Sequence, residues 1–393
     1  MKKIYSFCLA TLFCGGLFAQ PLGWSYSIPV VVTNNMASLV TNYQLQLTFD
    51  TQTPISLGQM QATGNDIRFG KDCAGNTLYN YWIESGINTT TTVVWVKIDT
   101  MQSLATRTFY LFYGNSSAPA ASAVNGTFVG PHSATDSVAS GGAGGATNSQ
   151  RGFRFSPNET VLMTHAGKRD PNGTVRYVTL FNFATQAIVT QQQVGGPAAQ
   201  YSYNPLTNPV WLTTGTQYVL ELYQGAADGY YFGTSSQIGQ HLTYLDMRYC
   251  NSCTQNTFPT NVLSNYHYGY PDMWYYTKQT LVTPPTVNYG SMIALTAVAS
   301  GAATICPGDS AQISMAATGG SPSYSYSWSP SATVSNPALM NPMAGPSATT
   351  TYTCTVTDQC GAIRVDSVVV TVNTLPTVVA NVSTDSVCSG ASF

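Results

Sequence analysis

The amino-acid sequence predicts an all-β protein made of tandem β-sandwiches. Short segments that alternate apolar and polar residues recur along the chain, with turn residues between them, which is the pattern of half-buried strands. Tyr43–Phe49, for example, places Tyr, Leu, Leu and Phe on one face. Aromatic residues make up 12% of the chain, which suits packed sheets rather than disorder. Alternating strands without a helical period imply two sheets packed face to face.

The composition limits the classes of partner. The chain has 393 residues, enough for about three domains of about one to two hundred residues each. Only 8% of residues are charged and the net charge is −2, so no surface for nucleic acid or anionic lipid is expected. A neutral surface rich in Thr, Asn and Tyr suits a glycan or another surface protein, and it equally suits an inert secreted protein.

Residues 1–19 have the pattern of a signal peptide. Lys2 and Lys3 form a charged start, Ile4–Phe13 form an apolar core, and Ala19 precedes the expected cleavage. The apolar run is too short to cross a hydrocarbon core of about 30 Å. We therefore expect an exported protein, secreted or held at the cell surface, without membrane insertion.

Cysteine usage agrees with export, because disulfides persist in oxidising compartments. The spacing of Cys250 and Cys253 suits a local bridge. Cys306 can pair with either Cys354 or Cys360, and the sequence does not choose between them. Cys73 has no obvious mate. The disulfide candidates are Cys250, Cys253, Cys306, Cys354 and Cys360.

The first domain is expected over residues 20–130, organised around Asp66–Ile98. A strand is predicted around Ile67, where apolar and polar residues alternate. Leu78–Glu84 and Val93–Ile98 are predicted as two more strands, with Gly- and Asn-containing turns between them. Nothing in this stretch has a helical period.

Several strings in this domain resemble a bacterial domain of unknown function, DUF2341. The likeness runs in order over about residues 22–128. It implies a secreted or surface module, because that family occurs on such proteins, often beside lectin-like sandwich modules. It implies no catalytic residues, since the family's biochemical role is unassigned. The strings are WSYSIPVVVTNN, LVTNYQLQLTFDT, GNDIRF, YWIESGINTTTTVVWVKI and TFYLFYGNSSA.

A Gly/Ser-rich segment at residues 131–149 is expected to be a linker, or else a long loop of the domain that follows. Residues 150–280 are expected to form a second sandwich, with alternating segments such as Thr174–Phe181. The GFRF start, the LFN strand end and the LTTGTQYVL segment resemble a jelly-roll module of large secreted bacterial proteins.

The C-terminal part is expected to be built of repeats. Thr283–Thr286 is predicted as a stiff linker because of its prolines. Residues 281–374 resemble the PKD-like and immunoglobulin-like repeats of bacterial adhesins, through the CPGDS, YSYSWSP and TTTYTCTVTD strings. Residues 375–393 repeat the beginning of that unit, with Cys388 echoing Cys306. A further, truncated repeat and further domains of a longer chain are therefore expected.

The acidic residues offer a weak case for catalysis. Glycoside hydrolysis needs two carboxyl groups about 5 to 9.5 Å apart in a cleft, and nothing in the sequence brings Asp66 and Glu84 together. Glu84 lies in an aromatic strand and needs a partner if it is buried; Arg68 is the natural one. The histidines form no recognisable Ser–His–Asp arrangement. No catalytic residue is predicted, with a secreted glycoside hydrolase as the alternative.

The case for a metal is also weak. Cys250 and Cys253 have the spacing of zinc ligands, with His241 or His267 to complete a site, but a local disulfide is favoured in an exported chain. Calcium binding by Asp66, Asp72 and Asn76 stays open, although their spacing lacks the dense acids of a calcium loop. No cofactor and no metal are predicted, with calcium as the alternative.

Two groups of residues are candidates for ligand binding. Aromatic rings can stack on the apolar face of a sugar while polar neighbours bond its hydroxyl groups. The rival interpretation is that the rings are core, which is favoured for Trp95 and Trp328. The candidates are Tyr79, Tyr81, Trp82, Glu84, Tyr268, Tyr270, Asp272, Trp274 and Tyr276.

These observations favour a secreted, non-catalytic cell-surface protein. Its N-terminal modules are expected to bind a glycan or a surface protein, with the immunoglobulin-like repeats as a stalk. The alternatives are a secreted enzyme acting on polysaccharides and a purely structural repeat protein in which every clustered aromatic residue is buried.

Overall fold

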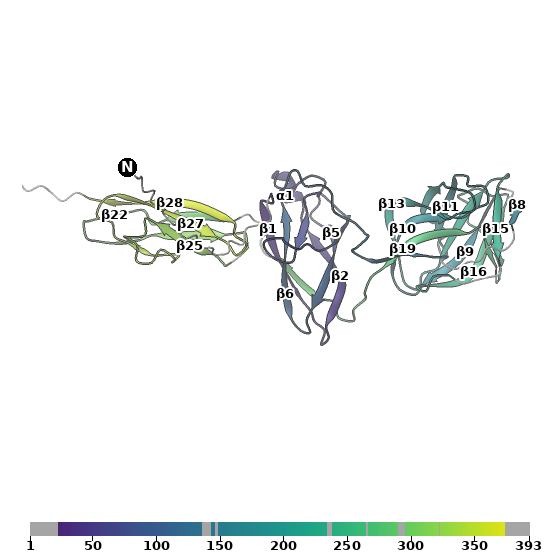
Figure 1. Cartoon of the computed structure of the whole chain (residues 1–393), viewed down its shortest axis with the longest axis horizontal. Coiled ribbons are helices and arrows are strands. Elements are labelled where there is room, and N and C mark those ends of the chain that lie inside the picture. The colour runs from purple at the N-terminus through teal and green to yellow at the C-terminus, as the bar shows by residue number, and fades with distance from the viewer. Residues whose placement is uncertain are drawn as a thin grey trace, which may run out of the picture.

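The computed structural model describes residues 23–135, 143–145, 148–233, 238–264, 266–289, 295–321 and 323–373. Within these ranges almost every regular element is a strand, so the all-β prediction is confirmed. Three hydrophobic cores mark three sandwiches, which lie in a row with the first in the middle (Figure 1). The predicted signal peptide and the predicted truncated repeat lie outside the described residues.

The first sandwich contains the predicted central stretch. Its apolar strand faces meet in one core that includes Ile67 and Phe69. One sheet runs in the order β20 (Thr286–Tyr289), β1 (Tyr26–Thr33), β6 (Thr106–Tyr113) and β3 (Arg68–Gly70). The facing sheet runs β2 (Val40–Phe49), β5 (Thr92–Met101) and β4 (Tyr81–Ser85).

The sequence did not predict the short helix α1 (Gln52–Ser56). The N-cap residue of α1 is Thr51. Asp50, which precedes it, accepts the Thr53 backbone N–H at 3.1 Å and the Thr53 hydroxyl at 2.6 Å. Five residues are too few to show a helical period, so the turn is set by these local bonds and by burial of Pro54.

Strand β20 changes the expected domain order. Thr286–Tyr289 falls in the segment predicted as a linker and the start of the third domain, yet it pairs antiparallel with β1 from Val30 to Thr33. Leu281 and Val287 pack against the first core. The chain therefore leaves the first sandwich, builds the second, and returns to complete a sheet of the first.

The second sandwich is thus an insertion within the first. Strands β7 and β8 take up part of the segment predicted as a linker. One sheet runs β13 (Ser202–Leu212), β10 (Val161–Lys168), β19 (Pro271–Thr277) and β7 (Val129–Ser133). The facing sheet runs β12 (Ile188–Val194), β11 (Arg176–Asn182), β14 (Tyr218–Gln224), β9 (Ser149–Pro157), β16 (Leu242–Asn251) and β17 (Asn261–Leu263). A smaller sheet holds β18 (His267–Tyr268), β15 (Gly229–Gly233) and β8 (Ala143–Gly145).

The third sandwich packs around Trp328, which is 2% exposed and donates its indole N–H to the Leu339 carbonyl at 3.0 Å. The core interpretation of Trp328 is therefore correct. The larger sheet runs β22 (Ala303–Ile305), β28 (Ile363–Val372), β27 (Thr350–Thr357) and β25 (Ser325–Ser329), with β22 parallel to β28. The smaller pairs are β21 (Thr296–Ser300) with β24 (Ser314–Thr318), and β23 (Ala311–Gln312) with β26 (Met343–Ala344).

The disulfides follow the predicted pattern only in part. Cys250 and Cys253 form the local bridge. Cys73, which had no obvious mate, is joined to Cys360 across 287 residues. Cys354 and Cys306 carry free thiols, the first buried and the second exposed, so both predicted pairings of Cys306 are wrong. Cys354 faces the third core, while Cys360 lies at the end of that sandwich that meets the first.

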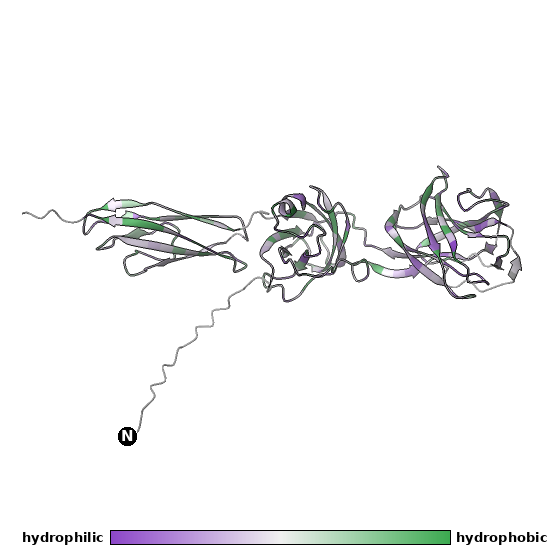
Figure 2. Cartoon of the chain, turned by 90° about the horizontal axis from the view of Figure 1, so that it is seen from above, coloured by the Kyte–Doolittle hydropathy of each residue, from purple (hydrophilic) through white to green (hydrophobic). Residues whose placement is uncertain are grey.

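Hydrophobic and hydrophilic stretches are both present on the strands of all three sandwiches (Figure 2). None of the helices in the described ranges has the length and apolar character needed to cross a membrane.

Candidate functional site

The tyrosines proposed as ligand-binding residues in the first sandwich are buried. Tyr79 is 5% exposed and donates to Asp99 at 3.2 Å. Tyr81 is 3% exposed and donates to the Ile67 carbonyl at 2.6 Å, and Arg68 donates to its hydroxyl at 3.1 Å. Both rings belong to the first core. They hold the sandwich together and present no face to a ligand.

Glu84 lies where the first and second sandwiches meet. Its carboxylate accepts the indole N–H of Trp95 at 2.6 Å and the indole N–H of Trp211 at 2.8 Å. Arg68, the partner expected from the sequence, instead donates to backbone carbonyls and to Tyr81 within the first sandwich. Glu84 therefore joins two domains through two tryptophans.

Aromatic rings surround this carboxylate. Trp82 and Trp95 make T-shaped contacts with Phe128 at centroid distances of 5.8 and 5.6 Å. The ring centroid of Trp211 lies 5.5 Å from that of Trp95. Trp95 is buried, as predicted, but in this junction cluster rather than in the sandwich core. The Lys278 ammonium lies 4.8 Å from the Trp95 ring centroid and 5.6 Å from that of Trp211. Burial lowers the pKa of Lys278, and the Glu84 charge opposes that shift.

Most of the candidates in the second sandwich are also buried. Tyr270 is fully buried, and Tyr276 is 5% exposed within the junction cluster. The side chain of Tyr268 lies outside the described residues. Asp272 is fully buried and accepts hydrogen bonds from the hydroxyls of Ser133 at 2.6 Å and Tyr203 at 2.5 Å. Burial raises the pKa of Asp272, and these hydrogen bonds oppose the rise.

Among the second-sandwich candidates whose side chains are described, Trp274 is the one that keeps partial exposure. It stacks on Tyr203 at a centroid distance of 4.5 Å and lies 4.9 Å from the His165 ring. These side chains come from β19, β13 and β10, which are neighbours in one sheet. The sequence could not have grouped them, because Tyr203 and His165 are far from Trp274 along the chain.

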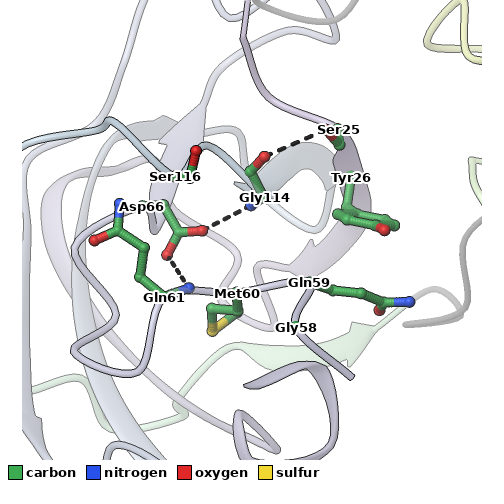
Figure 3. A pocket seen from close by; sticks show the side chains of 9 residues that line it. All are labelled: Ser25, Tyr26, Gly58, Gln59, Met60, Gln61, Asp66, Gly114 and Ser116. Carbon is green, nitrogen blue, oxygen red and sulfur yellow. Dashed lines mark hydrogen bonds between the residues drawn. The ribbon is translucent and has the colours of Figure 1, made fainter. Parts of the chain in front are cut away.

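The described surface also contains a pocket at one edge of the first sandwich (Figure 3). It has a volume of about 330 Å³, at the lower end of the range of about 300–1,000 Å³ for small-molecule sites. Tyr26 supplies an aromatic ring whose other neighbour is Tyr113, stacked at 4.9 Å. The lining residues are Ser25, Tyr26, Gly58, Gln59, Met60, Gln61, Asp66, Gly114 and Ser116.

Asp66 holds the wall of this pocket together. One carboxylate oxygen accepts the backbone N–H of Gln61 at 3.0 Å, and the other accepts that of Gly114 at 2.8 Å (Figure 3). The indole of Trp24 donates to the Asp66 carbonyl at 2.9 Å. Asp66 is 1% exposed, so it fixes the geometry of the wall more than it reaches a ligand.

The structure does not bring the two candidate acids together. Asp66 precedes β3 in one sheet, and Glu84 belongs to β4 in the facing sheet. The structure also does not group the three residues of the calcium alternative. Asp72 accepts the Asn76 N–H within a turn, whereas Asp66 accepts backbone N–H groups elsewhere. In the described ranges no three His, Cys, Asp or Glu side chains are placed to hold a metal ion.

The zinc alternative is wrong. Cys250 and Cys253 are joined to each other, which leaves no thiolate to bind a metal. His241 bonds Glu159 at 2.6 Å. His267 is fully buried among aromatic rings, and burial lowers its pKa to about 4.

Residues 63–134 match the family model of a domain of unknown function, DUF2341. The match covers β3 to β7. It includes Asp66, Glu84 and every residue that the first sandwich contributes to the junction cluster. No curated protein matches the chain.

Proposed function

We propose that this protein, which carries a DUF2341 domain, is a non-catalytic extracellular surface protein. Its fastened sandwiches form a stiff rod, and the pocket beside Tyr26 binds a neutral, hydroxyl-rich ligand such as a glycan residue. Export is supported by the two disulfides, which form in oxidising compartments.

The junctions support the rod. On one side, two chain segments and the aromatic cluster around Glu84 join the first sandwich to the second. On the other side, the Cys73–Cys360 disulfide joins it to the third. Sandwiches fastened in this way resist bending, which suits a part that holds a binding site away from a surface.

The pocket beside Tyr26 carries the ligand proposal. It combines a tyrosine ring with neutral amide and hydroxyl groups, and such a combination binds a sugar ring and its hydroxyl groups. Its one acid, Asp66, already accepts a backbone N–H on each oxygen. That arrangement favours binding over acid–base chemistry.

A glycan array with the full chain, followed by titration of the best ligand, tests the proposal. Tyr26→Ala is expected to weaken binding at least about tenfold, the effect of losing about 1.4 kcal/mol of stacking. Gln59→Ala, on the same pocket, is expected to weaken it less. Trp274→Ala is the matched control on a partly exposed aromatic group of the second sandwich and is expected to leave affinity unchanged.

Two outcomes count against the proposal. Loss of binding in Trp274→Ala with normal binding in Tyr26→Ala would move the site to the second sandwich. A glycan array that finds no ligand for the full chain would favour a purely structural role, provided that the Tyr26→Ala protein attaches to the cell surface as well as the wild type.

A further inference from the structure

The Cys73–Cys360 disulfide divides the chain into a closed loop and two open ends. The two cysteines are 287 residues apart, and every described strand of the second sandwich, from β7 to β19, falls between them. Strand β20, which returns to the first sandwich, also falls between them. A pull on the two ends of the chain therefore passes through the sulfur–sulfur bond, and the closed loop cannot be drawn out while that bond is intact.

Hydrogen bonds hold the Cys360 end of the bond at the start of β28. The Asp358 carboxylate accepts the backbone N–H groups of Cys360 and Ala362 at 2.9 Å each. Its second oxygen accepts the N–H of Ser321, also at 2.9 Å. Asp358 is 4% exposed, so water competes little for these bonds. Strand β28 begins three residues after Cys360, at Ile363. Force from the disulfide therefore enters the third sandwich at the N-terminal end of β28.

Strand β28 can transmit this force without lengthening. A strand already rises about 3.3 Å per residue, close to the limit of about 3.6 Å for a fully extended chain. It pairs with β27 from Ile363 to Val370 and with the parallel β22 near its C-terminal end. It lies lengthwise in the row of sandwiches (Figure 1). Strands β21 to β27 lie inside the closed loop, so the force does not stretch them.

The Cys73 end of the bond lies close to the pocket beside Tyr26. Strand β3 connects Asp66, which fixes the wall of the pocket, to the turn that holds Cys73. It pairs with β6, and Tyr110 and Phe112 of β6 pack against the disulfide. A pull on a ligand in the pocket would therefore reach the disulfide through β3 and β6, without crossing β20 or the second sandwich.

With the disulfide closed, a pull on the first sandwich acts along its strands. Strands β1 and β3 both pair antiparallel with β6, so they run in the same direction. The chain end pulls on the N-terminal end of β1, and the disulfide pulls on the C-terminal end of β3. These pulls are opposed along the strand direction, so they strain many ladder hydrogen bonds together.

Without the disulfide, the same pull would fall on the edge strand β20. It forms four residue pairs with β1, and its last residue, Tyr289, lies opposite Val30. Because the two strands are antiparallel, the N-terminal end of β1 and the C-terminal end of β20 lie at the same end of the ladder. A pull on these ends opens the hydrogen bonds one at a time. Once β20 is lost, the tension would reach β19 of the second sandwich, which ends at Thr277.

We propose that this protein bears tension along its length, and that the Cys73–Cys360 bond keeps β20 and the second sandwich out of the path of the force. The inference rests on the proposed function for the source of the pull, a ligand held in the pocket beside Tyr26. The force measurement that tests it uses no ligand. Its failure would leave the pocket proposal standing, and an empty glycan array would leave the path of the force standing.

Single-molecule force spectroscopy on the full chain, held by its two ends, tests this path. In the oxidised protein only the chain outside the closed loop is expected to lengthen. Of the described residues, these are 23–73 and 360–373, which extend to at most about 220 Å. Reductant is expected to release the loop and to add about 1,000 Å of extended chain. The first event is expected at a lower force after reduction, because β20 then opens one bond at a time.

Two paired-serine variants separate this bond from the local one. Cys73→Ser with Cys360→Ser is expected to behave as the reduced protein without any reductant. Cys250→Ser with Cys253→Ser removes a bridge that lies inside the closed loop. That control is expected to match the oxidised wild type until reductant is added, and then to release the same length of chain.

Two results would overturn the proposal. One is an oxidised wild-type chain that lengthens by about 1,000 Å beyond its open ends, since the second sandwich would then be under tension. The other is a first event at the same force in the oxidised wild type and in the Cys73→Ser, Cys360→Ser protein. Equal forces would mean that the bond does not protect β20.

Discussion

The first sandwich is fastened to its two neighbours by different chemistry. Towards the third sandwich, the contact is a small cluster of Cys73, Cys360, Tyr110, Phe112 and Trp24 around one disulfide. Towards the second, two chain segments cross and several aromatic rings enclose the Glu84 carboxylate. A covalent bond needs little packing around it, but the non-covalent junction depends on each contact. The two junctions should therefore respond to different perturbations.

Breaking the covalent junction is expected to have the largest effect. For a loop of 287 residues, the chain-entropy relation gives about 6 kcal/mol for the disulfide. The double variant Cys73→Ser, Cys360→Ser is expected to let the third sandwich move relative to the first. Small-angle X-ray scattering would then show a broader distribution of distances, with the first and second sandwiches still aligned. Cys250→Ser with Cys253→Ser is the control, because that bridge lies within one sandwich; an equal change in both variants would contradict the prediction.

We expect a single substitution to weaken the non-covalent junction between the first and second sandwiches. Trp211→Ala removes a ring that packs on Trp95 and Phe128 and one of the two donors to Glu84. We expect a loss of about 3–5 kcal/mol in the free energy of unfolding, measured by denaturant titration. Trp211→Phe keeps a ring and loses the N–H, so about 1–2 kcal/mol is expected. Equal losses in the two variants would show that the hydrogen bond, rather than packing, sets the strength.

Acid is expected to destabilise the second sandwich itself, because the titrating group, His267, lies inside it rather than at either junction. Burial lowers the pKa of His267 to about 4, against about 6.5 in an unfolded chain. The unfolded state therefore binds more protons between these values, and stability is lost as the pH falls from about 6.5 to about 4. The loss approaches about 3 kcal/mol.

The variant His267→Phe isolates this effect from other titrating groups. The ring contacts Phe153, Tyr244 and Tyr270, so a phenyl ring suits the space. Denaturant titrations at pH 7 and at pH 4.5 are expected to show a smaller pH dependence in the variant than in the wild type. The same slope in both proteins would mean that His267 does not control the acid response.

The smallest effect is expected from Lys278, at the edge of the non-covalent junction. Its ammonium lies over Trp95 and Trp211, and cation–π contacts of this kind contribute about 0.5–1 kcal/mol at partly exposed sites. Lys278→Met keeps the aliphatic stem and is expected to cost about that amount. In a double-mutant cycle with Glu84→Gln, non-additive losses would show that the two charges act together; strict additivity would show that they do not.

The sequence by itself determined the fold class and much of the local structure. The period-2 alternation around Ile67 and in Val93–Ile98 predicts strands wherever it occurs, because alternate residues face opposite sides of a sheet. The close spacing of Cys250 and Cys253 likewise predicted their bridge. The burial of Trp328 followed from the expectation that a tryptophan in a sandwich packs between the two sheets.

Only the tertiary structure decided which strands, cysteines and side chains lie against one another. The pairing of Cys73 with Cys360, the return of β20 to β1 and the contact of Glu84 with Trp211 each link residues far apart in sequence. Alternation gives the face of a residue but not the strand or domain that will lie against it. The aromatic candidates illustrate this limit: the same pattern placed Tyr79 in a core, Trp82 at a domain junction and Trp274 on a partly exposed face.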